Sequence, residues 1–450
     1  MMICEKMIGI SDINIYVPRS RLELDVLVKK RSESNPRLAR HLDRALRVTG
    51  QKTIRFTDMW EDPATMAAQA AYGLLKDRDE VSLANLRHLV VGTESGLDHS
   101  KPLSAFVQGM LQRAGLEIPD SLSSFQVQHA CAGATLSLLS VGGMLGMSNR
   151  SAESGLVIAT DIAHYETETT AEVTQGAGSV ALLLETSPNL LELDLSTIGM
   201  CSRDVDDFFR PLGSTTAKVK GRYSMEQYWA NLEAAFLDHA QRIGELPSEA
   251  LEATDFFVLH TPFRNMPESA MNVLLHKHLN LDEQQVKEFL DKRGFYRGVD
   301  PLARIGNIYS GSMYFFLASL LNDRFRHLGD RIVGKRMLLA SYGSGNTMMV
   351  YAARIAEGAP EVIRAWDFDR IFRSTREADF SEYERWTRGV HDRDTYEKML
   401  EDVALPPKSF YLSGIREDGY REYAFAADVR DWISQREAPV DLRRRVPVLR

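Results

Sequence analysis

Residues 131–145, CAGATLSLLSVGGML, place a cysteine directly before a run of small and aliphatic side chains. The part from Leu136 to Leu145 carries no charge, so it predicts a buried helix, and we place the start of that helix at Cys131. An apolar run before it, Leu86–Gly92 (LRHLVVG), predicts a buried strand that ends at Thr93-Glu94-Ser95-Gly96. Strand and helix thus bring an acid and a thiol to neighbouring element ends.

Two further apolar runs follow the predicted helix. Gly155–Thr160 (GLVIAT) and Ser179–Leu184 (SVALLL) each have the length and composition of a buried strand. Strands that alternate with buried helices indicate a layered α/β fold.

The second half of the chain repeats this order of elements. Phe256–Leu259 predicts a strand, Gly306-Asn307 opens a helical run over Ile308–Leu321, and Met337–Ala340 and Met348–Tyr351 predict two more strands. The repeat suggests duplication, with halves at residues 1–190 and 191–450. The charge-rich segment 367–406 predicts an exposed helical excursion in the second half. In a duplicated α/β fold, strand ends of both halves can meet at one cleft.

Composition excludes several function classes. The 450 residues carry a net charge of −8 without basic blocks, which argues against nucleic-acid binding. Three widely spaced cysteines, Cys4, Cys131 and Cys201, form neither a disulfide framework nor a metal motif. The N-terminus lacks a signal-peptide run, and continuous apolar stretches stay short of the ~20 residues that span a bilayer. A cytoplasmic protein without membrane contact is expected.

Cys131 is the candidate nucleophile. A cysteine at a helix N-terminus feels the positive end of the helix dipole, so we expect its pKa to be lowered. The small residues Ala132, Gly133 and Ala134 leave room for an acyl group. A lone cysteine is more often an inert buried residue, so Cys131 by itself leaves both interpretations open.

Glu94 and His260 are candidates for proton transfer. A carboxylate at the end of a buried strand is costly unless it is exposed or used, and desolvation would suit it to take a proton from carbon. His260, directly after the second-half strand, can hydrogen-bond a carbonyl oxygen or relay a proton. Considered singly, Glu94 also fits a surface turn, and His260 a core histidine.

Two weaker candidates lie in the second half. The amide of Asn307 can donate to an oxyanion beside His260, although an ordinary helix N-cap explains it equally well. The loop Ser341–Gly345 (SYGSG) offers backbone N–H groups to a carbonyl or anion, although a plain turn has the same composition.

The motifs together resemble the hydroxymethylglutaryl-CoA synthase family of the thiolase superfamily, which includes the polyketide-associated β-branching synthases. The resemblance covers most of the chain, in order. It rests on VGTES around Glu94, HACAGA around Cys131, TQGAG from Thr174, then DVDDFFRP, HTPF, GNIYSGSMY, SYGSG and FYLSGI. The fold implied is a thiolase fold: two duplicated halves in an αβαβα arrangement.

The resemblance also implies an activity. Cys131 takes an acetyl group from a donor thioester, and Glu94 removes a proton from its methyl group. The enolate adds to the ketone of an acetoacetyl thioester held by His260, and water frees the product. The substrate-binding residues implied are Tyr165, Thr174, Pro262, Asn307, Ser344 and Gly345.

No metal or prosthetic group is implied. The implied substrates are acetyl-CoA and acetoacetyl-CoA, or the same acyl groups on an acyl carrier protein, and the implied assembly is a homodimer. The pathway is mevalonate and isoprenoid synthesis, or polyketide synthesis.

Three features depart from the family or divide it. Ala132 stands where the family has a tyrosine, which is similar to the β-ketoacyl synthase III branch and predicts a wider pocket. Arg264-Asn265 stands where the family often has a lysine near the coenzyme A arm. Lys52–Ala68 looks like the polyketide-associated enzymes, and Val205–Leu212 like the mevalonate enzymes.

Alternatives therefore stay open: a β-branching synthase on carrier-protein substrates, a synthase III-like enzyme that keeps a ketone, or an inactive acyl-binding homologue. VGTES disfavours the synthase III alternative. The joint presence of Glu94, Cys131 and His260 disfavours the inactive one.

Overall fold

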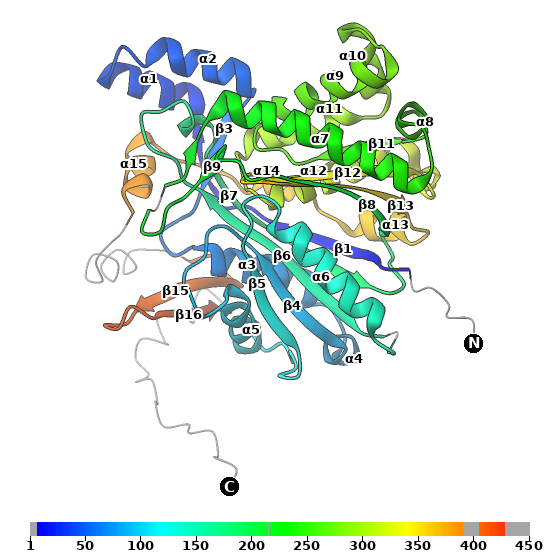
Figure 1. Ribbon diagram of the computed structural model, residues 1–450. Helices are drawn as coiled ribbons and strands as arrows, with labels where there is room; N and C mark the ends of the chain where they lie inside the picture. Colours follow the sequence, from blue (N-terminus) through cyan, green and yellow to red (C-terminus); the bar gives the residue numbers. More distant parts are fainter. Residues whose placement is uncertain (1–6, 151, 215, 390–404, 428–450) are drawn as a thin grey trace.

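The computed structural model describes residues 7–150, 152–214, 216–389 and 405–427 (Figure 1). Nine strands in this part of the chain form one mixed sheet. Their order across the sheet is β11 (Phe256–Leu259), β12 (Arg336–Gly343), β13 (Thr347–Ile355), β8 (Leu191–Ser202), β1 (Gly9–Tyr16), β7 (Gly176–Glu185), β6 (Ser154–Ala163), β4 (Leu86–Gly92) and β5 (Ser123–Val127).

The sheet has two parts that meet at a short contact. Strands β1, β4, β5, β6 and β7 form one part, and β8, β11, β12 and β13 form the other. Between the two parts, β1 and β8 pair over Gly9↔Glu192 and Ile10↔Leu191. Each part pairs strands in parallel at its outer end, β4 with β5 and β11 with β12. The division of the chain at residue 190 stays a prediction.

The helices of the described chain are α1 (Leu24–Ser34), α2 (Ala39–Thr49), α3 (Pro63–Leu75), α4 (Glu80–Ala84), α5 (Leu103–Arg113), α6 (Gly133–Met147), α7 (Gly221–Ile243), α8 (Pro247–Glu252), α9 (Asn265–Leu279), α10 (Glu283–Lys292), α11 (Phe295–Val299), α12 (Gly311–Leu328), α13 (Ala359–Ala365), α14 (Arg370–Arg373) and α15 (Phe380–Arg388). The faces of the large sheet are covered chiefly by α3, α5, α6, α7 and α12.

Short elements complete the described chain. They are the 3₁₀ turns η1 (Glu172–Thr174), η2 (Asp300–Arg304) and η3 (Gly329–Ile332), and the small strands β2 (Ser20–Glu23), β3 (Thr53–Phe56), β9 (Phe208–Phe209), β10 (Lys218–Val219), β14 (Arg376–Glu377), β15 (Ser409–Ile415) and β16 (Arg421–Ala426).

The helices and sheet parts stack in layers. Helix α3 packs on β1, β6 and β7, while α6 packs on β4 and β6. A hydrogen bond of 2.9 Å between the hydroxyls of Thr135 and Tyr314 joins α6 to α12, which in turn contacts β7 and β11. Helix α7 lies along β8 and β13, at the top of Figure 1. The order is helix, sheet, helix, sheet, helix.

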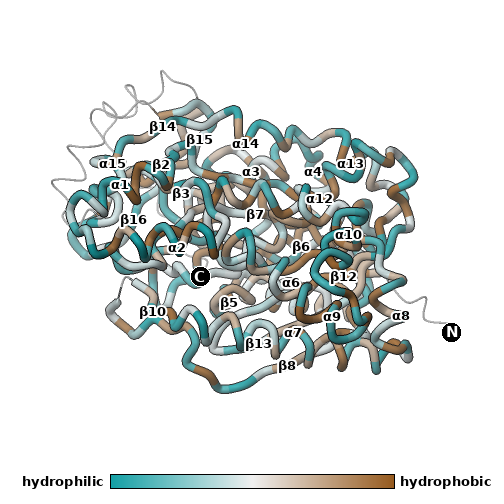
Figure 2. Tube along the Cα trace, turned by 90° about the horizontal axis from the view of Figure 1, so that it is seen from above, coloured by the Kyte–Doolittle hydropathy of each residue, from teal (hydrophilic) through white to brown (hydrophobic). Residues whose placement is uncertain are grey.

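Strand residues alternate between two cores because successive side chains point to opposite faces. On β4, Val90 joins the cluster that contains α6 and α12, whereas Leu89 and Val91 join the cluster beneath α3 and α5. In Figure 2 the hydrophobic trace runs through β6, β7 and α12 in the middle of the molecule. Burial on both faces explains why the sequences of these strands are continuously apolar.

Two predicted helix starts are wrong. Helix α6 begins at Gly133, because the chain turns sharply before it: Ala130 has a positive φ of 37°, and Cys131 forms an isolated bridge with His129. Helix α12 begins at Gly311 rather than at Gly306-Asn307, because Gly306 (φ 93°) and Tyr309 (φ 43°) hold an irregular loop. Asn307 is therefore not a helix N-cap.

The charged excursion at 367–406 is partly helical where the structure describes it. It contains α14, the small strand β14 and α15, whose N-cap Asp379 closes a capping box with Glu382. Residues 390–404 lie outside the described residues. Tyr383 of α15 is fully buried, so this excursion packs onto the body of the protein.

Candidate active site

Cys131 lies in a small buried cluster between the two parts of the sheet. The thiol-bearing residue is 9% exposed and packs with Ala163, Tyr165, Ala217 and Tyr309. Ala163 ends β6, Tyr165 follows two residues later, and Tyr309 belongs to the loop before α12. The predicted nucleophile therefore sits where ends of elements from both parts meet.

The surroundings raise the pKa of the Cys131 thiol well above its usual value. Burial is the main cause, and the carboxyl groups of Glu94, Asp161 and Asp207 add to it. The prediction of a pKa lowered by the helix dipole is wrong, because Cys131 precedes the first turn and faces three acids. The group is a neutral thiol at rest, and its proton must leave as the sulfur attacks.

Glu94 lies two residues after the end of β4 and is 5% exposed. Its Oε1 lies 3.7 Å from Nε of Arg210, and neither carboxylate oxygen accepts a hydrogen bond from the described residues. Burial raises the pKa of Glu94 to about 7, with Arg210 opposing and Asp161 assisting the rise. A buried carboxyl group with unoccupied oxygens and a pKa near neutrality is suited to general-base catalysis.

Asp161 holds Glu94 in place, and it was missed in the sequence. Its Oδ1 accepts hydrogen bonds from the backbone N–H of Glu94 (2.8 Å) and from the backbone and hydroxyl of Ser95 (3.1 and 3.0 Å). The hydroxyl of Thr93 donates to the same oxygen at 3.0 Å. Burial raises the pKa of Asp161 to about 7. A single acid within an otherwise apolar strand was the available signal.

Tyr165 and Asn307 meet beside Cys131. Nδ2 of Asn307 lies 3.2 Å from the Tyr165 hydroxyl, and Oδ1 of Asn307 accepts from the backbone N–H of Tyr309 at 2.9 Å. The side-chain amide of Asn307 thus hydrogen-bonds to Tyr165 and Tyr309. Its predicted role as an oxyanion donor beside His260 stays a prediction. Tyr309 was not singled out in the sequence, although it lies within the GNIYSGSMY motif.

The backbone of Thr174 contacts the loop that carries Asn307. Its carbonyl accepts from the N–H of Asn307 at 2.9 Å, while its hydroxyl donates to the carbonyl of Ala171 at 2.8 Å. The first contact links the loop after β6 to the loop before α12, and the second lies within the loop after β6. Substrate binding by Thr174 stays a prediction.

His260 follows β11 and is 1% exposed. The Tyr228 hydroxyl donates to the backbone carbonyl of His260 at 2.8 Å, and the two rings lie 6.4 Å apart. Burial lowers the pKa of His260 to about 3, so the ring is neutral at pH 7. Its Nδ1 makes no hydrogen bond with the described residues. Pro262 lies two residues further on and is half-buried; its binding role stays a prediction.

The SYGSG loop packs directly behind the nucleophile. A Cβ on Gly343 would lie 2.6 Å from Cβ of Ala132 and 2.9 Å from its backbone nitrogen, so only glycine fits there. Ala132 is fully buried against this loop, and the wider pocket expected from it stays a prediction. The N–H of Gly345 donates to Oδ1 of Asp207 at 2.9 Å. Ser344 is half-buried, and substrate contacts of Ser344 and Gly345 stay predictions.

The DVDDFFRP segment, residues 204–211, covers Glu94. Arg210 reaches the carbonyl of Glu94 with Nη2, and Phe208 meets the ring of Tyr309 edge-on at 5.9 Å. Asp207 is fully buried and accepts from the hydroxyl of Tyr342 at 2.9 Å. DVDDFFRP is one of the motifs that carry the family resemblance, but no role was predicted for its individual residues.

The five-layered α/β fold, with a buried thiol, a neutral histidine and a buried carboxyl group that accepts no hydrogen bond from the described residues, is that of a thiolase-fold condensing enzyme. Comparisons with known proteins agree. The sequence profiles "Hydroxymethylglutaryl-coenzyme A synthase N terminal" and "C terminal" match residues 4–189 and 299–426. The chain belongs to the hydroxymethylglutaryl-CoA synthase family, whose members form carbon–carbon bonds by acyl transfer.

Individual relatives cover nearly the whole chain. The hydroxymethylglutaryl-CoA synthase of Haloferax volcanii is 30% identical, over 84% of this chain and 91% of its own. The polyketide biosynthesis 3-hydroxy-3-methylglutaryl-ACP synthase PksG of Bacillus subtilis is 25% identical, over 85% and 88%. A solved structure of MvaS in complex with 3-hydroxy-3-methylglutaryl coenzyme A matches with a TM-score of 0.80 and 30% identity, covering 94% of this chain and 99% of that one.

Proposed function

We propose that this enzyme condenses an acetyl group carried on Cys131 with the ketone of acetoacetyl-CoA and releases hydroxymethylglutaryl-CoA. The observation that carries the proposal is Glu94, a buried carboxyl group with two unoccupied oxygens and a pKa of about 7, coupled electrostatically to the Cys131 thiol. Removal of a proton from an acetyl methyl group needs such a base in a dry site.

The first half-reaction forms the acetyl-enzyme. The sulfur of Cys131 attacks the donor carbonyl, a new S–C bond forms, and the donor thiolate leaves and takes up the proton of Cys131. A raised pKa of Cys131 means that this proton must be removed in step with the attack. The small neighbours Ala132 and Gly133 leave the acetyl group free of steric conflict.

The second half-reaction forms the carbon–carbon bond. Glu94 takes a methyl proton, the enolate carbon bonds to the ketone carbon of the acceptor, and the resulting alkoxide receives a proton. The neutral His260 ring, with Nδ1 unoccupied, fits a group that hydrogen-bonds the acceptor. Water then cleaves the S–C bond, which leaves a carboxylic acid on the product and restores the thiol.

Coenzyme A as the acceptor's carrier is supported by the 30% identical relative and by the matching MvaS structure. An acyl carrier protein is the alternative, supported by the likeness to PksG. Arg264 does not replace the family lysine as a free cation, because it pairs with Asp300 at 2.8 Å and with Glu268. With coenzyme A substrates, we place the enzyme in cytoplasmic mevalonate and isoprenoid synthesis.

We also propose a homodimer formed through β5 and α6. Strand β5 ends the sheet, and its outer edge has no partner strand among the described residues. The helix window Ala130–Met147 has a mean hydropathy of 1.5 but is only 56% buried, and Ser140, Gly143 and Met147 of α6 are exposed. An edge strand beside an apolar helix face suits a two-fold contact with a second copy.

Intact-protein mass spectrometry tests the reaction. Acetyl-CoA should add one acetyl group to Cys131, and acetoacetyl-CoA should then discharge it with hydroxymethylglutaryl-CoA as product. Cys131→Ala should lose acetylation, whereas Glu94→Ala should become acetylated without condensing. Discharge only by a carrier-bound acceptor would replace coenzyme A by a carrier protein. A ketone product, or normal condensation by Glu94→Ala, would contradict the assignment of Glu94.

A further inference from the structure

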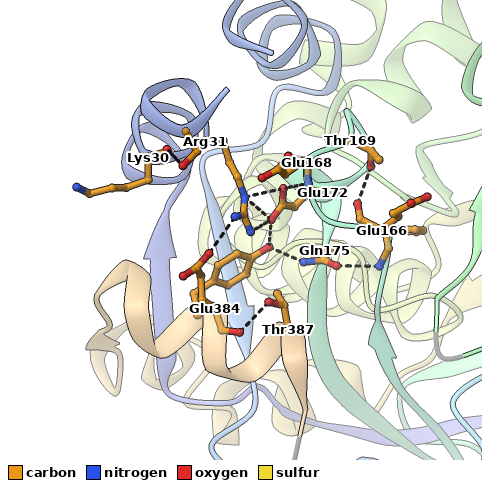
Figure 3. Close-up of polar contacts among 12 residues, drawn as sticks. Lys30, Arg31, Glu166, Glu168, Thr169, Glu172, Gln175, Glu384 and Thr387 are labelled. Atoms are coloured by element: carbon orange, nitrogen blue, oxygen red, sulfur yellow. Dashed lines mark hydrogen bonds and ion pairs between the residues drawn. The ribbon is translucent and has the colours of Figure 1, made fainter. Parts of the chain in front are cut away.

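A buried ion pair joins helix α1 to the loop that carries Tyr165. Nη2 of Arg31 lies 2.8 Å from Oε1 of Glu172, and their side chains are 6% and 0% exposed. Figure 3 shows Arg31 reaching from α1 toward Glu172, with Glu384 of α15 on its other side. Because burial of a charge is costly without hydrogen bonds, the partners of this pair indicate what it holds.

Every polar contact of Glu172 ties together chain segments around Tyr165. Oε2 accepts from the backbone N–H of Glu168 at 2.8 Å, at a residue with a positive φ of 61°. Oε1 accepts from the Tyr383 hydroxyl of α15 at 3.0 Å. The loop after β6 therefore surrounds the fully buried carboxylate of Glu172. Arg31 of α1 neutralises its charge, and the hydroxyl group of Tyr383 in α15 donates a hydrogen bond to it.

A continuous chain of hydrogen bonds leads from this carboxylate to Tyr165. The Tyr383 hydroxyl accepts from Nε2 of Gln175 at 2.6 Å. Oε1 of Gln175 accepts from the backbone N–H of Tyr165 at 2.8 Å, and this residue packs beside Cys131. Figure 3 shows Gln175 between this part of the loop and the Glu172 network.

We propose that Tyr383 and Gln175 are positioning residues that hold the Tyr165 ring against Cys131 and thereby set the geometry of the acyl pocket. The proposal rests on the proposed function for its kinetic consequences. It assigns a role to the charged excursion, because the hydroxyl group of Tyr383 in α15 is linked to Tyr165 through Gln175. Tyr165 in turn lies within hydrogen-bonding distance of Asn307. The same series of hydrogen bonds therefore also orders the loop before α12.

Tyr383→Phe removes only the hydroxyl group. The ring stays packed edge-on against Phe56 at 5.8 Å and beside Trp386 at 5.7 Å, so α15 keeps its apolar contacts. Gln175→Met is the second variant, because it removes both hydrogen bonds at a similar side-chain length. Tyr423→Phe is the matched control: its buried hydroxyl donates to Asp62 at 2.7 Å, between β16 and the start of α3.

The first measurement needs no substrate. Alkylation of Cys131 by iodoacetamide, followed by peptide mapping, reports how tightly the Tyr165 ring covers the thiol. We expect Cys131 to be alkylated about threefold to tenfold faster in Tyr383→Phe and Gln175→Met than in wild type. This range is the rate change that corresponds to the loss of one buried hydrogen bond. Tyr423→Phe should alkylate at the wild-type rate. Equal rates in all four proteins would overturn the proposal.

The second measurement is a double-mutant cycle on acetylation and turnover. Tyr383→Phe should raise the KM for the acetyl donor or the acceptor more than it lowers kcat, and Tyr165→Phe should do so as well. If Tyr383 acts through Tyr165, the two changes combine to less than the product of their separate effects. Fully multiplicative effects would overturn the proposal. A wild-type enzyme without turnover would contradict the proposed function instead, while the alkylation result would stand.

Discussion

Two buried carboxyl groups, Glu94 and Asp161, share the site with the thiol of Cys131. Their environments differ: Asp161 accepts five hydrogen bonds, four at Oδ1 and one at Oδ2 from the Ser310 hydroxyl, and Glu94 accepts none from the described residues. The pKa of each is raised to about 7, chiefly by burial. The carboxyl group of Asp161 is thus occupied in holding the turn Thr93–Ser95. The carboxyl oxygens of Glu94 remain available to take a proton from the substrate.

The raised pKa of Glu94 makes a prediction about stability. In the unfolded chain this carboxyl group titrates near 4.5, and in the folded protein near 7, so the folded state binds the proton more tightly. Folding stability should therefore fall as pH rises from about 4.5 to 7, by an amount on the order of 3 kcal/mol from this group. Glu94→Gln removes that dependence, so the variant should gain stability relative to wild type between pH 5 and pH 8.

Urea denaturation at the two pH values measures this gain. The exposed Glu226, which pairs with Arg222 on α7, provides the control Glu226→Gln, for which the difference from wild type should stay constant. Parallel pH dependence of wild type and Glu94→Gln would show that Glu94 is not a protonated acid in the folded protein at pH 5.

At the scale of elements, the site depends on how closely β12 approaches the start of α6. Gly343 ends β12 and touches Ala132, the N-cap of α6, so the nucleophile is clamped between β5 and a strand from the other half. The same close approach recurs at Gly176, where a Cβ would lie 2.7 Å from the carbonyl oxygen of Asn307. Such contacts set the spacing of the halves around the pocket.

Gly343→Ala should displace the Cys131 segment. The new Cβ would meet Ala132 at 2.6 Å and the carbonyl oxygen of His129 at 2.9 Å, and backbone atoms yield only at a cost of about 1–3 kcal/mol. We expect a folded protein with a lower Tm and a rate of Cys131 acetylation reduced roughly tenfold or more. Gly221→Ala, with no atom within 4 Å of its Cβ, should leave the acetylation rate unchanged. Normal acetylation by Gly343→Ala would refute the clamp.

At the scale of the molecule, the site lies between two sheet parts that meet over only two residue pairs. The buried layer of α6 and α12 holds them together, with the hydroxyls of Thr135 and Tyr314 joined inside it. The residues after β5 lead directly into the nucleophile turn. A second copy docked on β5 and α6 would therefore stiffen the segment that carries Cys131.

The proposed dimer can be tested with charges on the exposed face of α6. The double variant Ser140→Glu, Met147→Glu should sediment at the mass of one chain, while wild type sediments at twice that mass. Both positions are exposed in a single chain, so the monomer should keep its fold. Leu212→Glu, at a residue 92% exposed elsewhere, should remain a dimer. A monomeric wild type would refute the dimer itself.

Much of the fold was readable from local patterns. Strands β4 and β11 have the predicted bounds, and β6, β7, β12 and β13 extend theirs, because strands buried on both faces have continuous apolar sequences. The helix starts were misplaced because positive φ values at Ala130 and Tyr309 leave no compositional sign. Family membership followed from motifs that are short, ordered and spread over both halves.

The sequence by itself determined the layered α/β class, the family and the identity of the three candidate catalytic residues, since each depends on residues adjacent along the chain. Only the tertiary structure decided the charge states and the supports: a thiol whose pKa is raised, a base whose oxygens accept no hydrogen bond from the described residues, and Tyr165 held from α15. The physical reason is that desolvation and Coulomb interactions depend on distance in space, and Glu94, Asp161 and Asp207 reach Cys131 only after folding.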